Sequence, residues 1–351
     1  MSAILRNNLP VPGKPWRQTR SQKFTNILIF LLAILSSYFI VQSTALKGKL
    51  AYSVIFFISF LVIDYLNARL RKGKSAGQDA IFRGFVSMGM LIAIIPIVSI
   101  LFSVIQRGYK GLHWSLFTTD MHSTAPTAPI QEGGLIHAII GTFLLVLVAL
   151  VISMPIGILT AIYLTEIKGR FSRPIKFLVQ AMSGVPSIVA GLFILAAIVY
   201  PITKNFNSFE GSLALAILMV PTIARTSEEV LLLVPQDLRE SGLALGGTQW
   251  RTVAQIILPA ARSGLVTSMI LGIARVAGET APIVLLVGGG DTKNWNIFNS
   301  PMGSLPSYIW KGFGAGTPES ITRAWAGIII LLSLVLILFS IARLLSDRKS
   351  K

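Results

Sequence analysis

Cysteine is absent from the 351-residue chain, which excludes a disulfide framework and a thiolate metal site. Charge is scarce as well, because only 13% of the residues are charged, whereas soluble domains carry about 25%. With a mean hydropathy of +0.71, this shortage of charge indicates an integral membrane protein. Histidine is too sparse and scattered to suggest a metal cluster; the three residues are His113, His122 and His137.

Acidic residues are outnumbered by basic ones, 14 to 31, and the net charge is +17. A nucleic-acid-binding protein gathers its Lys and Arg residues on a polar face. Here they stand in short clusters between apolar runs, so the charge predicts no nucleic-acid partner. The first 24 residues lack an apolar core followed by a small-residue cleavage site, so we expect no cleaved signal peptide.

Long apolar runs are what the chain has in abundance. A helix needs about 20 apolar residues to cross a bilayer. The runs are continuous rather than alternating, which favours helices over the strands of a β-barrel. The sequence therefore predicts an all-α integral membrane protein with about eight transmembrane helices. The eight runs cover residues 25–42, 50–66, 85–105, 136–164, 175–200, 211–234, 262–287 and 324–344.

The distribution of Lys and Arg predicts the orientation of these spans. Twenty-one of the 31 basic residues fall in segments on the same side as the N-terminus, and eight fall in segments on the other side. Since cytoplasmic loops carry an excess of Lys and Arg, we expect a multi-pass protein with both termini in the cytoplasm. The loop between the sixth and seventh runs is then cytoplasmic too.

The first two runs are separated from the other six by a basic linker. We expect a two-helix membrane extension over residues 1–80, a core over 81–347 and a cytoplasmic tail over 348–351. The linker contains a Gly-Lys-Ser triplet that suggests a phosphate loop, but that motif needs glycine where the chain has Ala68. The chain is therefore expected to have no ATP site of its own, and energy must come from a partner.

The loop between the sixth and seventh runs is patterned. Asp237 and Glu240 have the spacing of a capping box at the start of a helix. Gly246 and its neighbouring glycine break that helix, and Thr248 can begin another. The pattern predicts a helix–glycine–helix hairpin with an apolar face at the cytoplasmic surface. Two interpretations stay open, an interfacial hairpin that only joins two spans and a docking element for a soluble partner.

The spacing within this loop resembles the "EAA" loop of ABC import permeases. Small residues follow the glutamate, although serine and glycine replace the usual two alanines. The resemblance implies coupling helices that sit in a cleft of an ATPase subunit, and it implies a type I importer core of six helices. The residues that carry it are Glu240, Ser241, Gly242, Gly246, Ile256, Leu258 and Pro259.

Further stretches resemble the phosphate-import permeases of the PstA type, over about residues 85–345. The resemblance implies a bacterial cell-membrane subunit without chemistry of its own. Its implied partners are a second homologous permease, an extracytoplasmic phosphate-binding protein, membrane lipid, and an ATPase dimer that binds ATP and Mg and docks on residues 236–260. The matching stretches are Ser183–Phe193, Arg225–Gly246, Ala277–Leu286 and Pro301–Trp310.

Charged residues inside spans are costly and therefore candidates for function. The sixth run carries Arg225 with Glu228 and Glu229, and the seventh carries Arg275 with Glu279. Spacings of three and four residues place both partners on one helix face, and Arg suits bidentate contact with phosphate. These residues are candidates for a substrate pathway; the alternative is that each Arg–Glu pair only joins helices.

Two further features bear on transport. The segment 184–187 (Gly-Val-Pro-Ser) is the best candidate for a broken helix that lines the pathway, although a packing kink is the alternative. The long outer segments 106–134 and 288–323 suggest a meeting surface for the binding protein, with an interfacial aromatic belt as the alternative.

Two other function classes remain open. A permease of the same superfamily for another oxyanion, such as sulfate or molybdate, would share every motif above. A non-transporting membrane scaffold or a channel would share the spans, but neither needs the EAA loop.

Overall fold

The computed structural model describes residues 20–44, 48–298 and 301–347. The basic residues before residue 20, Lys47 and the predicted tail at 348–351 lie outside the described residues. Nearly all of the described chain is helical, and its only strand-like feature is an isolated bridge between Gly288 and Met302. The chain divides into two compact units, one up to Ile100 and one from Leu101.

The first unit contains α1 (Arg20–Ser43), α2 (Lys49–Lys72) and most of α3 (Lys74–Gly108). The linker predicted between the second and third spans is therefore helical, and only Gly73 interrupts it, with a left-handed φ of 96°. The boundary between the units falls inside α3 rather than near residue 80. The separate role of residues 1–80 stays a prediction.

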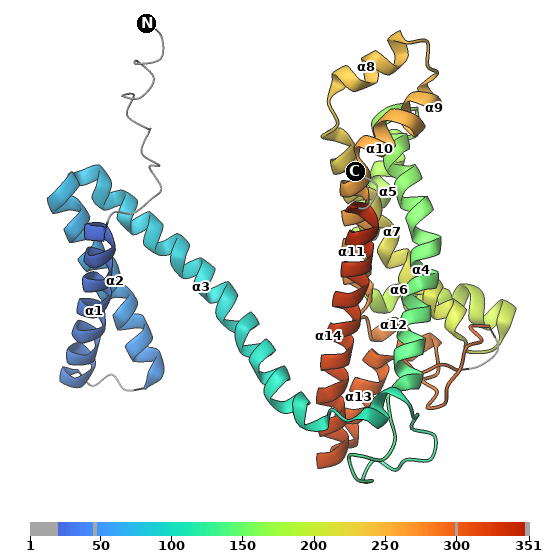
Figure 1. Cartoon of the computed structure of the whole chain (residues 1–351), viewed down its shortest axis with the longest axis horizontal. Helices are drawn as coiled ribbons and strands as arrows, with labels where there is room; N and C mark the ends of the chain where they lie inside the picture. The colour runs from blue at the N-terminus through green and yellow to red at the C-terminus, as the bar shows by residue number, and fades with distance from the viewer. Residues whose placement is uncertain (1–19, 45–47, 299–300, 348–351) are drawn as a thin grey trace, which may run out of the picture. The chain divides into compact units, whose positions relative to one another are not determined.

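α1 and α2 form an antiparallel pair within this unit (Figure 1). Phe30 and Phe56 meet edge to face across it, with ring centroids 5.3 Å apart. Asp64 on α2 is buried and forms a 2.9 Å ion pair with Arg83 on α3. Most large apolar side chains of these helices are exposed, as expected for helices whose solvent is lipid.

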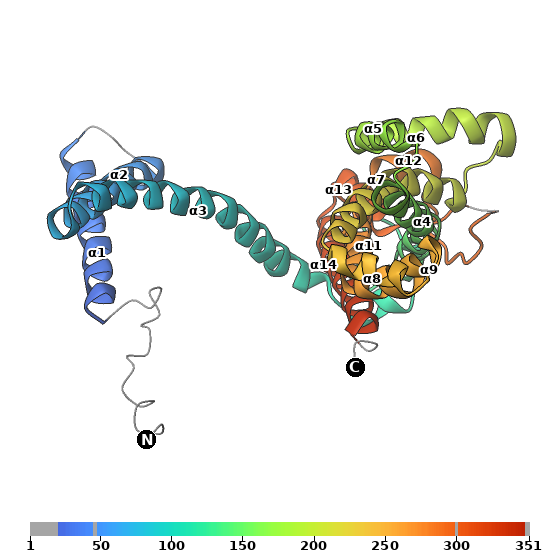
Figure 2. The same ribbon diagram turned by 90° about the horizontal axis from the view of Figure 1, so that it is seen from above.

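The second unit is a bundle in which α4, α7, α11 and α14 lie close together (Figure 2). Short π-helical stretches η3 (Tyr163–Ile167), η4 (Leu195–Thr203) and η5 (Val253–Ile257) interrupt it. Its α-helices are α4 (Ile136–Ile162), α5 (Ser172–Ser183), α6 (Ser187–Ile194), α7 (Ser208–Leu232), α8 (Gln236–Ala244), α9 (Gln249–Thr252), α10 (Leu258–Ala260), α11 (Arg262–Val276), α12 (Ala281–Leu286), α13 (Leu305–Ala315) and α14 (Pro318–Asp347).

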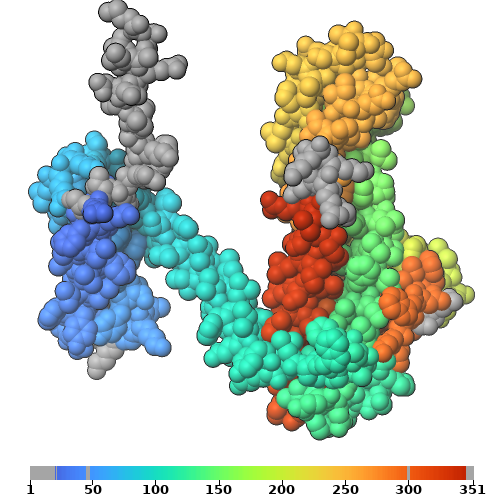
Figure 3. Space-filling view, in the orientation of Figure 1, coloured from blue at the N-terminus to red at the C-terminus, as the bar shows by residue number. Residues whose placement is uncertain are grey.

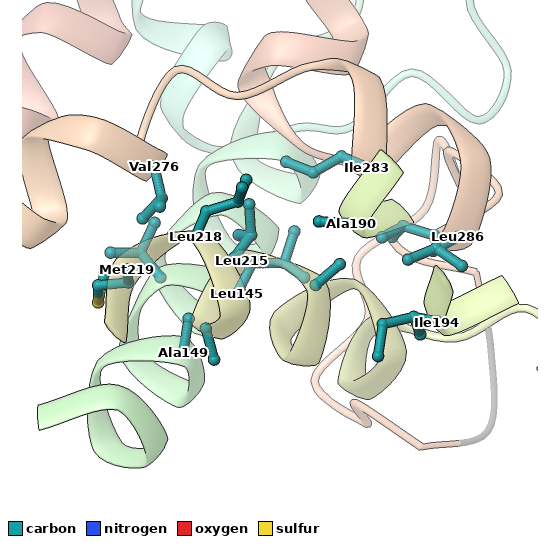
Figure 4. Packing of buried hydrophobic residues seen from close by; sticks show 14 of the residues in the cluster. Leu145, Ala149, Ala190, Ile194, Leu215, Leu218, Met219, Val276, Ile283 and Leu286 are labelled. Carbon is teal, nitrogen blue, oxygen red and sulfur yellow. The ribbon is translucent and has the colours of Figure 1, made fainter. Parts of the chain in front are cut away.

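The core of this unit forms where α4 and α7 pack along their lengths (Figure 4). Small residues let the helices approach closely, as is common between membrane helices. A Cβ atom on Gly157 would lie 2.7 Å from Ile223, and one on Gly272 would lie 2.8 Å from the same side chain. The buried cluster includes Leu145, Ala149, Ala190, Ile194, Leu215, Leu218, Met219, Val276, Ile283 and Leu286.

The spans agree broadly with the eight predicted runs. Five helices in the described part of the chain are long and apolar enough to cross a membrane, and two bent helix pairs raise the number to seven. α7 covers the sixth run as one 25-residue helix. The five helices are Gln22–Ser43, Lys49–Lys72, Lys74–Gly111, Ile136–Ile167 and Pro318–Leu344.

Two predicted spans are broken. The fifth run bends by 106° between Ser183 and Ser187, which confirms the prediction of a broken helix there. The seventh run ends as a helix at Val276 and resumes only at Ala281. A second bend, of 74°, separates the end of α10 from α11 at Ala261.

Candidate functional site

The loop after α7 folds as the predicted hairpin, in which α8 is followed by a tight turn and then by α9, η5 and α10. Gly246 adopts a left-handed φ of 80°, a conformation that favours glycine. The turn closes when Gly247 donates its N–H to the carbonyl of Gly242 at 3.2 Å. Thr248 then caps α9 by accepting a hydrogen bond from the N–H of Arg251, as predicted.

Gly242 is the contact point between the two arms of the hairpin. A Cβ atom at this position would lie 2.6 Å from Thr252 and 2.8 Å from Ile256. Any side chain larger than that of glycine would therefore force Thr252 and Ile256 to shift. Ser241, its neighbour, is exposed instead.

The capping box predicted for α8 does not form. The helix begins at Gln236 after Pro235, and no side chain accepts a hydrogen bond at its N-cap. Asp237 therefore lies inside the first turn, where its negative charge interacts favourably with the positive end of the helix dipole. Glu240 is exposed on the surface of the hairpin rather than folded back on the helix start.

Several large apolar side chains are exposed on the outer surface of the hairpin. Leu245 is 87% exposed, and Trp250 is also largely exposed. At the far side of the hairpin, Ile256 and Leu258 are half-buried and Pro259 is exposed. The hairpin forms one end of the second unit (Figure 3), so its apolar tip is available to a partner.

A buried clasp holds the hairpin to the end of α4, and sequence reasoning missed it. The single N–H of Arg239 Nε, on α8, is shared between the two carboxylate oxygens of Glu166 at 3.1 and 3.3 Å, and Nη2 donates to Oε1 at 3.0 Å. Arg239 also donates to the backbone carbonyls of Leu231 and Val234 at the end of α7. The side chains of Arg239 and Glu166 are only 16% and 6% exposed.

The same carboxylate residue is fixed from a second side. Gln249 on α9 donates its side-chain N–H to the backbone carbonyl of Glu166 at 2.6 Å. Both arms of the hairpin are therefore hydrogen-bonded to Glu166 in η3. The signal in the sequence was a carboxylate at the end of the fourth run, but its partner lies 73 residues away.

The charges of the sixth span are redistributed relative to the prediction. Arg225 pairs with Glu229 at 3.6 Å, four residues along α7. Glu228 instead pairs at 2.9 Å with Lys176 on α5, a residue that sequence reasoning did not select. All four line a cavity with a volume of about 200 Å³.

The cavity contains two cations and two carboxylates, which neutralise one another. Glu228 is the protected member, since its side chain is 14% exposed, whereas the side chain of Arg225 is 62% exposed. An exposed guanidinium held by one exposed carboxylate can exchange that partner for another anion at little cost. Lys176 is as exposed as Arg225, but Arg225 has the longer ion pair, 3.6 Å against 2.9 Å, and the more exposed carboxylate partner.

The pair predicted in the seventh span does not form on one helix face. α11 ends at Val276, so Glu279 lies beyond the helix, in the turn before α12. The four-residue spacing places two side chains together only within a continuous helix, and Gly278 and Pro282 interrupt this one. In the described part of the chain, Arg275 is exposed and has no ion-pair partner.

Comparison with known proteins shows which chains this one is similar to. The family model described as "Binding-protein-dependent transport system inner membrane component" matches residues 153–351, which include the hairpin and the charged cavity. "Phosphate transport system permease protein PstA 1" of Mycobacterium tuberculosis (strain CDC 1551 / Oshkosh) is 38% identical over 277 residues, covering 78% of this chain and 89% of that protein.

A second relative is matched over almost its whole length. "Phosphate transport system permease protein PstA" of Haemophilus influenzae is 34% identical over 285 residues, covering 81% of this chain and 99% of that protein. A solved MetNI methionine ABC transporter in an inward-facing conformation is 20% identical, with a TM-score of 0.46, covering 60% of this chain and 90% of that chain.

The family model and the two PstA relatives, together with the helical membrane fold, confirm the predicted fold class and the predicted resemblance. The chain belongs to the binding-protein-dependent transport system inner membrane components and, among them, to the family of PstA permease proteins.

Proposed function

We propose that this chain is the membrane-spanning permease subunit of an ATP-driven importer, and that it translocates inorganic phosphate by alternating access. The observation that carries the proposal is the hairpin 236–261. Its apolar tip is exposed, and its base is clasped to α4 and α7 by Arg239 and Glu166. A soluble ATPase that binds the tip can therefore move the membrane helices.

The coupling residues have distinct roles in this proposal. Glu240 faces the ATPase from the exposed surface of α8, while Gly242 and Gly246 hold the two arms of the hairpin together. Ile256 anchors the second arm against Gly242. Because the tip is apolar and the clasp is a buried ion pair, docking and transmission use separate parts of the hairpin.

The substrate pathway passes the cavity lined by Arg225, Glu228 and Lys176. A phosphate ion in a low-dielectric span needs a cation, because an unpaired charge there costs several kcal/mol. Arg225 leaves Glu229 to bind the anion, while Lys176 stays neutralised by Glu228. The carboxylates restore neutrality once the anion has left. Arg275 and Glu279 lie further along the pathway as candidate contacts.

The proposed transporter contains several subunits besides this chain. ATP and Mg bind to the partner ATPases, which form a dimer below the hairpin. A second homologous permease completes the pathway, an extracytoplasmic phosphate-binding protein delivers the ion, and lipid surrounds the spans. Both termini lie in the cytoplasm. The second candidate substrate is another oxyanion, sulfate or molybdate, because Arg225 attracts the negative charge that all of these anions carry.

The test is uptake of radiolabelled phosphate by right-side-out vesicles that contain the whole transporter, with sulfate and molybdate as competitors. Glu240→Arg should abolish ATP-dependent uptake and reduce co-purification of the ATPase, while the permease still reaches the membrane. Uptake that is blocked by sulfate rather than by excess phosphate would transfer the proposal to the other oxyanion. Uptake without ATP would indicate a channel.

A further inference from the structure

Arg323, near the start of α14, is a buried cation with unused hydrogen-bond donors. The residue is 1% exposed. Its Nη2 donates to the backbone carbonyls of Ala128, Pro129 and Glu132, at 2.7, 2.6 and 3.3 Å. Its Nε and Nη1 have no hydrogen-bond partner in the described structure. A buried donor without an acceptor costs about 1–3 kcal/mol, and more when it is charged, so these two donors favour binding of an acceptor.

Arg323 lines a cavity with a volume of about 210 Å³. A single water needs only about 10–15 Å³, so the cavity has room for a small hydrated anion. It lies between the segment 112–135, α13 and the first turns of α14. These elements form the end of the second unit opposite the hairpin (Figure 1). The other lining residues are Met121, Thr124, Pro126, Asp291, Tyr308, Lys311, Gly312, Ala315 and Ser320.

The cavity carries a net positive charge. Lys311 donates to the carbonyl of Gly289 at 2.6 Å and lies 3.7 Å from the carboxylate of Asp291. Lys311 and Asp291 are both half exposed, so this pair is weak and open to exchange. With Arg323, two cations face one carboxylate, which favours an anion.

Two neutral groups add donors to the same cavity. Thr124 contributes a hydroxyl group to the lining. Burial raises the pKa of Tyr308 to about 12, the nearby Arg323 lowers it and Asp291 raises it. Tyr308 therefore keeps its proton at neutral pH and can donate a hydrogen bond to an anion.

We propose that this cavity is an outer binding site for inorganic phosphate, with Arg323 and Lys311 as its cationic ligands and Asp291 as the acceptor for the hydroxyl of the ion. Phosphate at neutral pH still carries a proton, whereas sulfate carries none and is repelled by a carboxylate. The site therefore selects phosphate over sulfate. It rests on the proposed function and orientation, and it lies at the opposite end of the unit from the Arg225 cavity.

The site holds the ion on the extracytoplasmic face before the ion enters the pathway. Arg323 has a second role there, because its bonds to three carbonyls fix the 112–135 segment. Replacing it would disturb that segment as well as the site. The experiment therefore uses Lys311 as reporter and Asp291 as the varied residue.

The experiment measures how fast a membrane-impermeant amine reagent acylates Lys311 in right-side-out vesicles that contain the whole transporter, with mass spectrometry as the readout. Inorganic phosphate at about ten times its dissociation constant should slow labelling of Lys311 about tenfold. Labelling of Lys293 is the internal control, because it is exposed on the same outer segment, lies outside the cavity and should keep its rate. Sodium sulfate should not protect Lys311.

Asp291→Asn tests the selectivity, because an amide no longer repels a fully ionised anion. In this variant sulfate should protect Lys311 as well as phosphate does. The proposed site would be overturned if phosphate did not slow the acylation of Lys311 in vesicles that take up phosphate normally with ATP. The proposed transport function would then still stand. Equal protection by sulfate in the unsubstituted protein would overturn the role of Asp291.

Discussion

Arg239 and Glu166 form the most buried ion pair in the described part of the chain. Arg239→Met leaves the Glu166 carboxylate buried without its partner, and breaking such a pair costs about 3–5 kcal/mol. We expect the purified transporter to melt at a lower temperature and to lose ATP-driven uptake. Adding Glu166→Leu should recover much of the melting temperature, because an apolar pair avoids the uncompensated charge, but it should not recover uptake.

The matched control is Arg251→Met, which removes an exposed cation from α9 in the same hairpin. It should change the free energy of unfolding by no more than about 0.5 kcal/mol. The melting temperature should therefore stay close to that of the unsubstituted protein. If Arg251→Met destabilises the transporter as much as Arg239→Met does, the clasp has no special role.

Arg225 tests the substrate pathway at the same scale. A hydrogen bond to a charged group contributes about 1.5–3 kcal/mol, so Arg225→Gln should reduce phosphate uptake about ten- to hundredfold without preventing assembly. Arg225→Lys should rescue it in part, since Lys keeps the charge but loses the planar fork. Radiolabelled uptake, with membrane expression checked by blot, measures both.

Lys176→Met separates the two ion pairs of the cavity. It leaves Glu228 unneutralised beside the pathway, and we expect that carboxylate to repel phosphate and lower uptake. Arg173→Gln is the control, because it removes an exposed cation from the same helix outside the cavity.

Normal uptake by a well-expressed Arg225→Gln protein would contradict the prediction for Arg225. Arg225 would then only form a structural ion pair.

The hairpin is the element whose shape can be tested most directly. Gly242→Leu introduces a side chain where even a Cβ atom would lie 2.6 Å from Thr252. Overpacking of this kind costs about 1–3 kcal/mol, so the arms should separate and the ATPase should no longer co-purify. Gly246→Ala should act more mildly: its Cβ meets open space, and only the left-handed φ, at about 1–2 kcal/mol, opposes it.

The comparison of the two glycines is informative because both belong to the predicted motif. Equal loss of the ATPase in the two variants would contradict this order and would mean that the turn at Gly246 matters as much as the packing at Gly242. Ser241→Ala, next to Gly242 and exposed, should change little and serves as the control.

At the scale of the whole molecule, the two units predict a tolerated truncation. A chain that begins at Gly77 keeps nearly all of α3, whose end belongs to the second unit. There Arg107 lies over the ring of Trp325, 5.1 Å from its centroid, and Gly108 packs against the same turn of α14. We expect this chain to assemble with the ATPase and to transport phosphate, as measured by co-purification and uptake.

A second truncation that begins at Leu101 is the counterpart. It removes most of α3, so it should insert poorly. Failure of the Gly77 chain to assemble, although it reaches the membrane, would show that α1 and α2 are part of the functional fold.

Local pattern was sufficient for much of the structure. The eight apolar runs follow from hydropathy, and the hairpin with its turn at Gly246 follows from glycine and threonine at fixed spacing. The break at 184–187 follows from a glycine and a proline within an apolar run. Each of these depends on neighbours in the chain, so the sequence determines it.

Only the tertiary structure decided which charges meet. Arg239 finds Glu166, Lys176 finds Glu228, and Arg323 finds the carbonyls of the 112–135 segment. Helical spacing predicts partners on one helix, and it succeeded for Arg225 with Glu229. Partners on different helices depend on how the helices pack, and periodicity carries no information about that. Arg275 and Glu279 illustrate the opposite failure, because the helix that would join them ends first.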